Sequence, residues 1–375
     1  MFKTIFAWIL GLSALTGMLA AADQAKPNSP TATAISSTAK AAGAAKPSSA
    51  TAAAPAALKD AVLYSVKAGK HSAIARMDVN GACKRFLSQV PGRRWVASLP
   101  VEHKADDLGA VGSADGKWIA FYSTRSGHLN LWLAKSDGSA VEALTSEDVD
   151  ISPRQELGEE LAFSPDSKSL AFVMHGDLWL MDLASRGLVT LSSGKGVKAL
   201  TWSPNSRWIA FVQGLSLRRI GVAGAPLELL ASGTVNYPTL AWTGDSDKGA
   251  LLFFGRGLQR VSLDRKVELL YPSLLTPNRV RGLPTSPDKG LLLAQLSNGG
   301  TELFFANFEG KARKAEQVTN GGAEDALFLP DGKAFLFLRQ GRLWRCNLDG
   351  RQAKPITDAD ASLPWAGKLA PGECL

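Results

Sequence analysis

Histidine side chains are the first candidates for chemistry, because imidazole nitrogens can ligate zinc or move protons near neutral pH. Only four His residues occur in the 375-residue chain. Three of them, His71, His128 and His175, each stand between two short apolar segments. If these segments are strands of successive repeats, the three turns lie on the order of 10 Å or more apart, whereas zinc ligands lie about 2 Å from one shared ion. We therefore expect no metal site from these residues.

Basic residues gather in the same kind of short segment as the histidines. Together with Trp95, which follows Arg93 and Arg94, they form a predicted contact face that consists of Lys70, His71, Arg125, His128, His175, Arg256, Arg339, Arg342 and Trp95. Trp and Arg are enriched among the residues that dominate binding energy at interfaces. The pattern indicates a surface for an acidic protein, peptide or envelope polymer. A solvated basic rim, with Trp95 packed inside its loop, is the alternative that the sequence leaves open.

Hydrolase chemistry of the α/β type would require a nucleophile on a G-x-S-x-G elbow, and the sequence has none. The nearest approach, residues 214–218, lacks the second Gly. The acidic segment from Glu147 to Glu160 has carboxylates that suit Ca²⁺ but not the D-x-D-x-D-G spacing of a calcium loop. We therefore expect no catalytic residue, no cofactor and no metal.

One turn recurs six times and defines the elements that carry these residues. Its Asp or Asn is Asp115, Asp166, Asn205, Asp245, Asp288 and Asp331. The copies are 51, 39, 40, 43 and 43 residues apart, and most precede a short apolar strand such as 118–121 or 208–211. A period near 40–45 residues with hairpin turns is typical of a β-propeller, in which each repeat forms one four-stranded blade.

The repeat at residues 161–193 shows the expected blade. Residues 161–163, 170–173, 178–182 and 188–191 have the apolar, β-branched and aromatic composition of strands A, B, C and D.

The first repeat lacks a strand A. Residues 62–66, 73–79 and 85–88 supply strands B, C and D, and the segment around Trp365 has the composition of the missing strand. Closing the ring with this segment would remove a free sheet edge. The sequence therefore predicts an all-β fold: a seven-bladed β-propeller of four-stranded antiparallel blades, closed by a C-terminal strand. Six blades are the alternative.

The repeat F/W-S-P-D-x-K-x-[IL]-A-F followed by L-W-x-x-D resembles the TolB-type propeller repeat. It is clearest at Phe163–Phe172 with Leu178–Asp182 and at Trp202–Phe211, and the resemblance spans residues 61 to about 367. The same repeat occurs in periplasmic scaffold proteins and in the propeller domains of prolyl-oligopeptidase-like peptidases. The resemblance implies the fold and, as an expectation, contacts with envelope proteins. TolB has a compact α/β domain ahead of its propeller, which this chain replaces with a tract rich in Ala, Pro, Ser and Thr.

The N-terminal residues have the pattern of an export signal. Residues 1–22 contain Lys3, an apolar run from Ile5 to Leu19 and small residues at the end. An uncleaved anchor, which would bring the protein into contact with the membrane, is the alternative. Residues 23–57 are almost only Ala, Ser, Thr, Pro and Lys, the composition of a disordered linker. We expect the propeller, residues 58–375, to lie in the periplasm.

Charge limits the classes of partner, and cysteine content limits the possible disulfides. The formal net charge is +8, and +5 remains for residues 58–375 once Lys3 and the linker, at +2, are set aside. Lys and Arg do not form runs, so we expect no nucleic-acid partner. Cys83, Cys346 and Cys374 leave one thiol over, and their spacing does not decide which pair would form a disulfide.

These observations predict a monomeric, non-enzymatic propeller that binds an envelope protein or peptide at its central channel or turn face. One alternative is a hydrolase or lactonase that uses a cation in the channel. That chemistry requires several Asp, Glu or Asn residues converging at the starts of strands A, where this sequence has mainly Leu, Ala, Phe and Trp. The other alternative is a module that binds cell-wall polysaccharide.

Overall fold

The computed structural model describes the chain from residue 59 onward. The described residues are 59–98, 104–146, 160–224, 226–233, 235, 237–244, 249–272, 276–283, 285–310, 313–358 and 361–369. All of them belong to a compact unit that spans Ala54–Leu375. The predicted signal, the predicted linker, most of the acidic segment 147–160 and Cys374 lie outside the described residues. Within the described ranges, no helix has both the length and the hydrophobicity needed to span a membrane.

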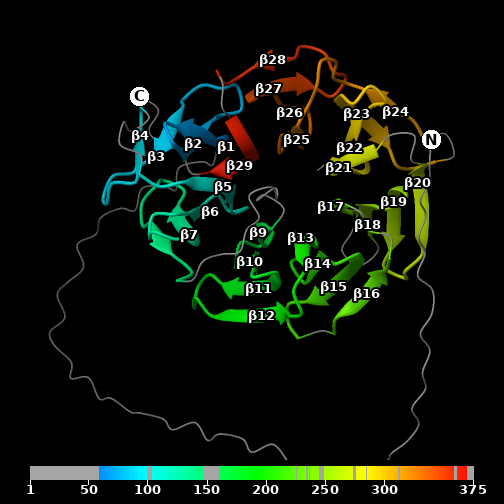
Figure 1. Ribbon diagram of the computed structural model, residues 1–375, viewed down its shortest axis with the longest axis horizontal. Coiled ribbons are helices and arrows are strands. Elements are labelled where there is room, and N and C mark those ends of the chain that lie inside the picture. The colour runs from blue at the N-terminus through cyan, green and yellow to red at the C-terminus, as the bar shows by residue number, and fades with distance from the viewer. Residues whose placement is uncertain are drawn as a thin grey trace, which may run out of the picture. The chain divides into compact units, whose positions relative to one another are not determined.

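The fold is all-β, and seven antiparallel sheets stand around a central axis as the blades of a propeller (Figure 1). From the axis outward, the strand positions of a blade are called A, B, C and D. Blade 1 consists of β29 (Ala361–Leu369), β1 (Lys59–Ala68), β2 (His71–Asp78) and β3 (Arg85–Leu87), with a fifth strand, β4 (Trp95–Val96), outside them. Blade 2 consists of β5 (Asp107–Gly112), β6 (Trp118–Ser123), β7 (Asn130–Lys135) and β8 (Glu142–Ala143). Blade 3 consists of β9 (Leu161–Phe163), β10 (Ser169–Met174), β11 (Asp177–Asp182) and β12 (Leu188–Ser192).

The remaining four blades follow the same order. Blade 4 consists of β13 (Val197–Trp202), β14 (Trp208–Gln213), β15 (Ser216–Gly221) and β16 (Glu228–Ala231). Blade 5 consists of β17 (Tyr237–Thr243), β18 (Ala250–Phe254), β19 (Gly257–Ser262) and β20 (Val267–Pro272). Blade 6 consists of β21 (Thr276–Leu283), β22 (Ser286–Gln295), β23 (Thr301–Asn307) and β24 (Ala315–Gln317). Blade 7 consists of β25 (Asp325–Phe328), β26 (Ala334–Arg339), β27 (Arg342–Asn347) and β28 (Lys354–Pro355). Seven blades confirm the prediction and exclude the alternative of six.

The hydrophobic core lies between blades. Strand B carries the longest buried runs, because neighbouring blades cover both of its faces; five of the six residues of β6 are buried. One cluster joins Tyr122 of blade 2 to Leu161 and Phe163 of blade 3. Strand D faces outward, so Leu188 and Val189 of β12 remain exposed.

The recurring turn joins strands A and B, and its Asp or Asn closes it. In blade 3 the Ser164 hydroxyl donates to Asp166 Oδ1 at 2.6 Å, and the same oxygen accepts the Lys168 N–H at 3.2 Å. The turn requires a positive φ, which is 59° at Ser167 and 60° at Ser206. The hydroxyl of Ser206 accepts the Asp166 N–H of the preceding blade at 3.0 Å. The repeated motif is thus used to build turns and to tie one blade to the next.

One copy of this motif differs from the prediction, and another lies outside the described residues. In blade 6 the turn lies at Thr285, because Leu283 pairs with Ser286 after a register shift, and Asp288 belongs to β22. The predicted turn at 287–290 is therefore wrong for this blade. The copy at Asp245 lies outside the described residues.

The C-terminal strand closes the ring, as predicted. β29 pairs with β1 from Lys59 with Leu369 to Val66 with Ala361, and Leu63 lies opposite Trp365. The Trp365 indole reaches blade 2, where a Cβ atom on Gly112 would overlap the ring. Figure 1 shows the red β29 beside the blue β1 at this seam. Blade 1 therefore combines the two ends of the folded chain.

The cysteines are in different states. Cys83, in the turn after β2, is disulfide-bonded. Cys346 of blade 7 is a free, buried thiol, and burial raises its pKa. The sequence did not decide between these states.

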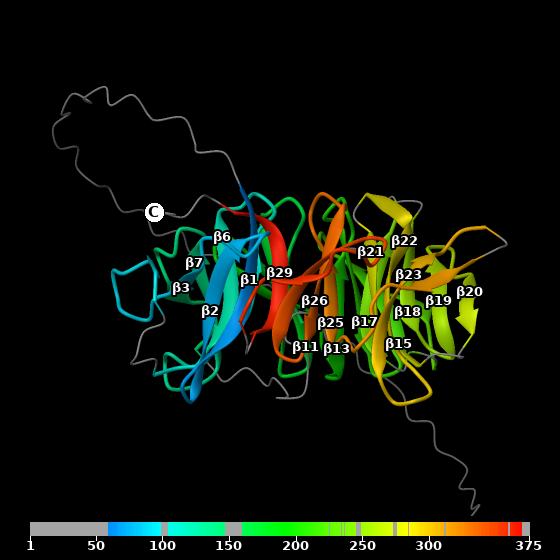
Figure 2. The same cartoon turned by 90° about the horizontal axis from the view of Figure 1, so that it is seen from above.

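The turns of the ring fall at two ends, which Figure 2 shows with the blades seen from the side. We call the end that carries the turns between strands B and C, together with the links from one blade to the next, the B–C end. The opposite end carries the A–B and C–D turns, and we call it the A–B end. Because β1 runs from Lys59 to the B–C turn at 69–70, Lys59 and its partner Leu369 lie at the A–B end.

Candidate functional site

Eight of the nine predicted contact residues lie at the B–C end, in or beside the turns of blades 1, 2, 3, 5 and 7. Five of them have exposed side chains, namely Lys70, His128, His175, Arg256 and Arg342. His71, Arg125 and Arg339 are partly buried. The structure therefore places the predicted residues on one end of the ring, but distributes them around it.

The B–C turns carry a strong excess of positive charge. With their flanking residues they span 67–72, 123–130, 174–177, 213–216, 254–257, 295–301 and 339–342. These segments contain six Lys or Arg residues and a single carboxylate, Asp177. Asp177 accepts the backbone N–H of Lys195 at 2.9 Å, so it is used within the fold.

Two acidic residues on described links between blades, Asp106 and Glu324, also bond within the fold. Asp106 Oδ1 accepts the Ser72 N–H at 2.8 Å, and its Oδ2 lies 3.4 Å from Nδ1 of His71. Glu324 accepts the Gln340 N–H at 2.8 Å. These carboxylates hold B–C turns against neighbouring strands, and among the described residues no carboxylate forms an ion pair with Lys70, Arg256 or Arg342.

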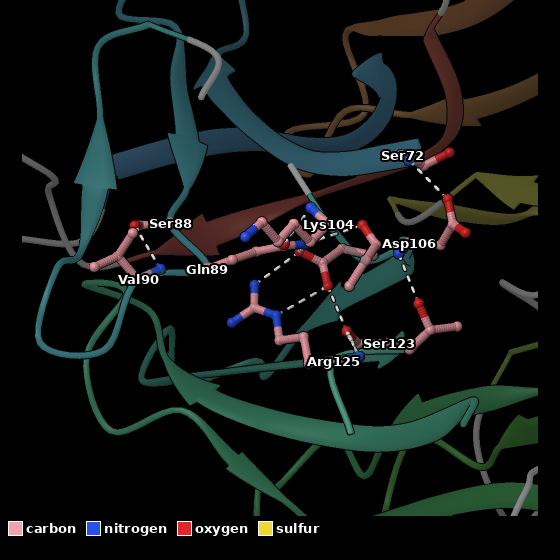
Figure 3. Close-up of polar contacts among 11 residues, drawn as sticks. Ser72, Ser88, Gln89, Val90, Lys104, Asp106, Ser123 and Arg125 are labelled. Carbon is pink, nitrogen blue, oxygen red and sulfur yellow. Dashed lines mark hydrogen bonds and ion pairs between the residues drawn. The ribbon is translucent and has the colours of Figure 1, made fainter. Parts of the chain in front are cut away.

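Arg125 is not a free surface cation, contrary to the prediction. Its Nη2 and Nε atoms lie 2.7 and 3.0 Å from the two carboxylate oxygens of Asp107, which is fully buried. The Ser123 hydroxyl and Gln89 donate to the same carboxylate at 2.5 and 3.2 Å. Figure 3 shows Gln89, Ser123 and Arg125 converging from two blades. The guanidinium also lies 5.3 Å from the Phe121 ring centroid.

Arg339 is likewise used inside the fold. Its guanidinium lies 4.9 and 5.1 Å from the ring centroids of Phe337 and Trp344, and its Nε donates to the Gly322 carbonyl at 2.8 Å. The sequence missed both roles because the partners of Arg125 and Arg339 are 17 or 18 residues away.

Trp95 lies on the outside of blade 1 and packs against blade 2. Its Nε1–H donates to the Ser136 carbonyl at 3.0 Å, and Arg76 donates to the same carbonyl at 3.2 Å. The Arg76 guanidinium lies 5.4 Å from the Trp95 ring centroid, and burial lowers the pKa of Arg76. Trp95 is thus a packed loop aromatic, the alternative that the sequence left open.

The segment that contains Trp95 forms an outer strap, which we define as residues 88–96. Its two ends are fixed: Gln89 donates to the Ala105 carbonyl at 2.9 Å and accepts the Lys104 N–H at 3.1 Å, while Arg94 pairs with Asp137 at 3.1 Å. Between the strap and blade 2 lies a cavity of about 500 Å³. It is lined by residues 88–94 of the strap and by Arg125, Trp132 and residues 138–141 of blade 2.

A second, smaller cavity of about 220 Å³ opens on the inner strands. Arg279 and Arg281 of β21 share Asp325 of β25, at 2.5 and 3.6 Å. Burial lowers the pKa of Arg279 to about 10, although Asp325 opposes the shift. Trp365 and Phe328 complete the wall. The sequence predicted that strands A are mainly apolar, and these charges were missed. Single Arg and Asp residues within apolar strands were the available signal.

No group of three or more His, Cys, Asp or Glu residues in the described part of the chain could hold a metal ion. The three turn histidines lie on separate blades. Residues 147–159, which contain most of the carboxylates considered for Ca²⁺, lie outside the described residues.

Comparisons with known proteins identify the fold. No protein-family model matches the chain, and no curated protein matches it in sequence. TolB from Acinetobacter baumannii is similar in structure, with a TM-score of 0.50 and 16% identity, over 82% of this chain and 66% of that chain. The oligogalacturonate lyase of Vibrio parahaemolyticus gives a TM-score of 0.55 and 11% identity, over 80% and 86%. A prolyl endopeptidase gives 0.52 and 13%, over 84% and 51%.

These likenesses define a class of protein. The chain is a seven-bladed β-propeller, and its fold is similar to parts of TolB, the lyase and the peptidase. It spans about two thirds of the TolB chain and half of the prolyl endopeptidase chain. At these identities the likeness is one of fold, and it includes both enzymes and TolB.

Proposed function

We propose that this chain is a non-enzymatic, exported β-propeller that binds an acidic protein or peptide of the cell envelope at its B–C end. The observation that carries the proposal is the difference in charge between the B–C turns and the turns of the A–B end. The B–C turns contain six Lys or Arg residues and one carboxylate, whereas several turns at the A–B end contain both an acidic and a basic residue.

Electrostatics and exposure support an acidic partner. Lys70, Arg256 and Arg342 are exposed and form no ion pair with any described residue. A surface with one sign of charge attracts and orients a partner of the opposite sign. The export pattern and the TolB-type repeat, both expectations from the sequence, point to the envelope as the place where that partner is found.

Co-purification from the envelope fraction tests the proposal. The full chain and a triple variant, Lys70→Glu with Arg256→Glu and Arg342→Glu, are used as baits, and captured proteins are identified by mass spectrometry. The matched control, Lys168→Glu with Lys333→Glu and Lys354→Glu, makes the same charge change on exposed lysines of the A–B end. We expect an acidic partner that the full chain and the control capture and the triple variant loses. Equal capture by all three baits would refute the proposed face.

The alternative function is a small-molecule hydrolase or lyase of the channel. The observation in its favour is the cavity of about 220 Å³ beside Arg279, Arg281 and Asp325 on the inner strands. Metal analysis of the purified protein, with a screen of esters, lactones and acidic sugars, separates the two functions. Turnover that Arg281→Gln abolishes would favour the enzyme. Binding to cell-wall polysaccharide, the third reading, would appear as co-sedimentation with peptidoglycan.

A further inference from the structure

The outer strap breaks the repeat of the propeller at one place. Among the described blades only blade 1 has a fifth strand, and β4 pairs with β3 through Phe86 with Val96 and Leu87 with Trp95. The strap is also fixed to blade 2 by the hydrogen bonds of Trp95 to Ser136 and of Gln89 to Asp107. A two-residue strand adds little to the sheet, so its main structural consequence is the walled cavity between the strap and blade 2.

The walls of this cavity combine cationic and apolar groups. Arg93, Arg94 and Arg125 line it together with the Trp132 ring and Val141. The strap itself supplies Val90, a residue that is 51% exposed. At about 500 Å³ the cavity is within the range of ligand sites.

The arginines outnumber the carboxylates that neutralise them. Arg125 pairs with the buried Asp107, and Arg94 pairs with Asp137. Arg93 is exposed, and its side chain forms no ion pair with any described residue. Among the described lining residues, the charge of Arg93 is therefore not neutralised, and Val90 and Trp132 line the same cavity.

We propose that the cavity under the outer strap binds a segment of an acidic peptide, with a Glu or Asp side chain on Arg93 and a neighbouring apolar side chain against Val90 and Trp132. The inference adds a second site to the proposed function and rests on that function for the nature of the partner. A guanidinium can hold a carboxylate through two parallel hydrogen bonds, which a lysine cannot do. The floor is rigid before binding, because Arg125 is already held by Asp107, Ser123 and the rings beside it. Little ordering is then required when the peptide binds.

The proposal is tested with a defined peptide. A fluorescein-labelled hexapeptide of alternating Glu and Phe is titrated against the full chain, followed by fluorescence anisotropy, and compared with the same peptide in which Gln replaces Glu. We expect saturable binding of the Glu peptide, about tenfold tighter than that of the Gln peptide and weakened by salt.

Variants locate the site. Arg93→Glu is expected to weaken binding of the Glu peptide about tenfold or more, and Arg93→Lys to give an intermediate affinity. Lys168→Glu, the same change of charge at the A–B end, should leave the affinity unchanged. Since Arg93 is exposed, the melting temperatures of all three variants should match that of the parent chain. Equal binding by Arg93→Glu and the parent, equal binding of the two peptides, or an equal loss in Lys168→Glu would overturn the proposal.

The outcome also separates this inference from the proposed function. If Arg93→Glu still captures the envelope partner while the Lys70, Arg256 and Arg342 variant loses it, the strap site is refuted and the B–C end stands. If Arg93→Glu loses the peptide while the triple variant retains the envelope partner, the strap site stands and the proposed face is refuted.

Discussion

The two ends of the ring use charged residues in different ways. At the A–B end the acidic residues recur at fixed positions and accept hydrogen bonds from their own turns, as Asp166 and Asp182 do. At the B–C end the cations recur less regularly, and Lys70, Arg256 and Arg342 are exposed. In a repeat protein, residues that recur in register are explained by the turn that each blade must build. Residues that depart from the register are the better candidates for recognition.

The largest effect on stability is expected at Arg125, the cation of the B–C end that lies in the core. Asp107→Ala would leave Arg125 buried without its carboxylate, and this should lower the free energy of unfolding by about 3–5 kcal/mol. Chemical denaturation followed by tryptophan fluorescence measures the loss. A change below about 1 kcal/mol would show that Arg125 belongs with the exposed cations and that the ends differ less than we argue.

A turn carboxylate of the A–B end should have a smaller effect. Asp166→Ala removes the acceptor for the Ser164 hydroxyl and the Lys168 N–H, and we expect a loss of about 1–2 kcal/mol. Lys168→Ala in the same turn is the control and should stay within about 0.5 kcal/mol, because its side chain is exposed. Equal effects of the two substitutions would contradict the structural role of the repeated Asp.

Acid should lower the stability of the protein through the carboxylates in the turns of the A–B end. Hydrogen bonds from Ser262 and Lys266 lower the pKa of Asp264 to about 2, and those from Ser185 lower the pKa of Asp182. A carboxyl group whose folded pKa is depressed contributes stability above its unfolded pKa, and the contribution is lost as pH falls through the folded value. The urea midpoint should therefore fall between about pH 4 and pH 2. Asp264→Asn should flatten this slope, and an unchanged slope would argue against the turn bonds.

The smallest effect on stability is expected from the exposed cations. Lys70→Glu, Arg256→Glu and Arg342→Glu should each change the free energy of unfolding by no more than about 0.5 kcal/mol, because these side chains are exposed and form no ion pair with a described residue. Thermal unfolding of each variant gives the measurement. A large loss at any of the three positions would mean that the cation is structural, as Arg125 is, and would remove it from the proposed contact face.

Much of the fold could be predicted because each blade repeats local chemistry. The strands of blade 3, the turn residue Asp166 and the closure around Trp365 all follow from patterns within a few residues or from the missing strand of the first repeat. The turn of blade 6 was misplaced, since a register shift before Leu283 moves it and the Pro-Asp pattern gives no sign of the shift.

The candidate site was less predictable, because its contacts cross blades or join distant residues. Nothing near Arg125 in the sequence shows that Asp107 neutralises it, and nothing near Trp95 shows that Ser136 of the next blade accepts its N–H. The pair of Arg279 with Asp325 joins residues on two inner strands. The repeat therefore predicts which residues lie on turns, whereas the exposure of their side chains depends on these distant partners.

The pairing of Lys59 with Leu369 has a practical consequence for experiments with this protein. A tag or surface linkage placed at Lys59 or Leu369 would lie at the A–B end, opposite Lys70, Arg256 and Arg342. Sensor chips and affinity resins loaded through such tags would display the cationic turns to the solution, so a failure to capture a partner there could not be blamed on the attachment.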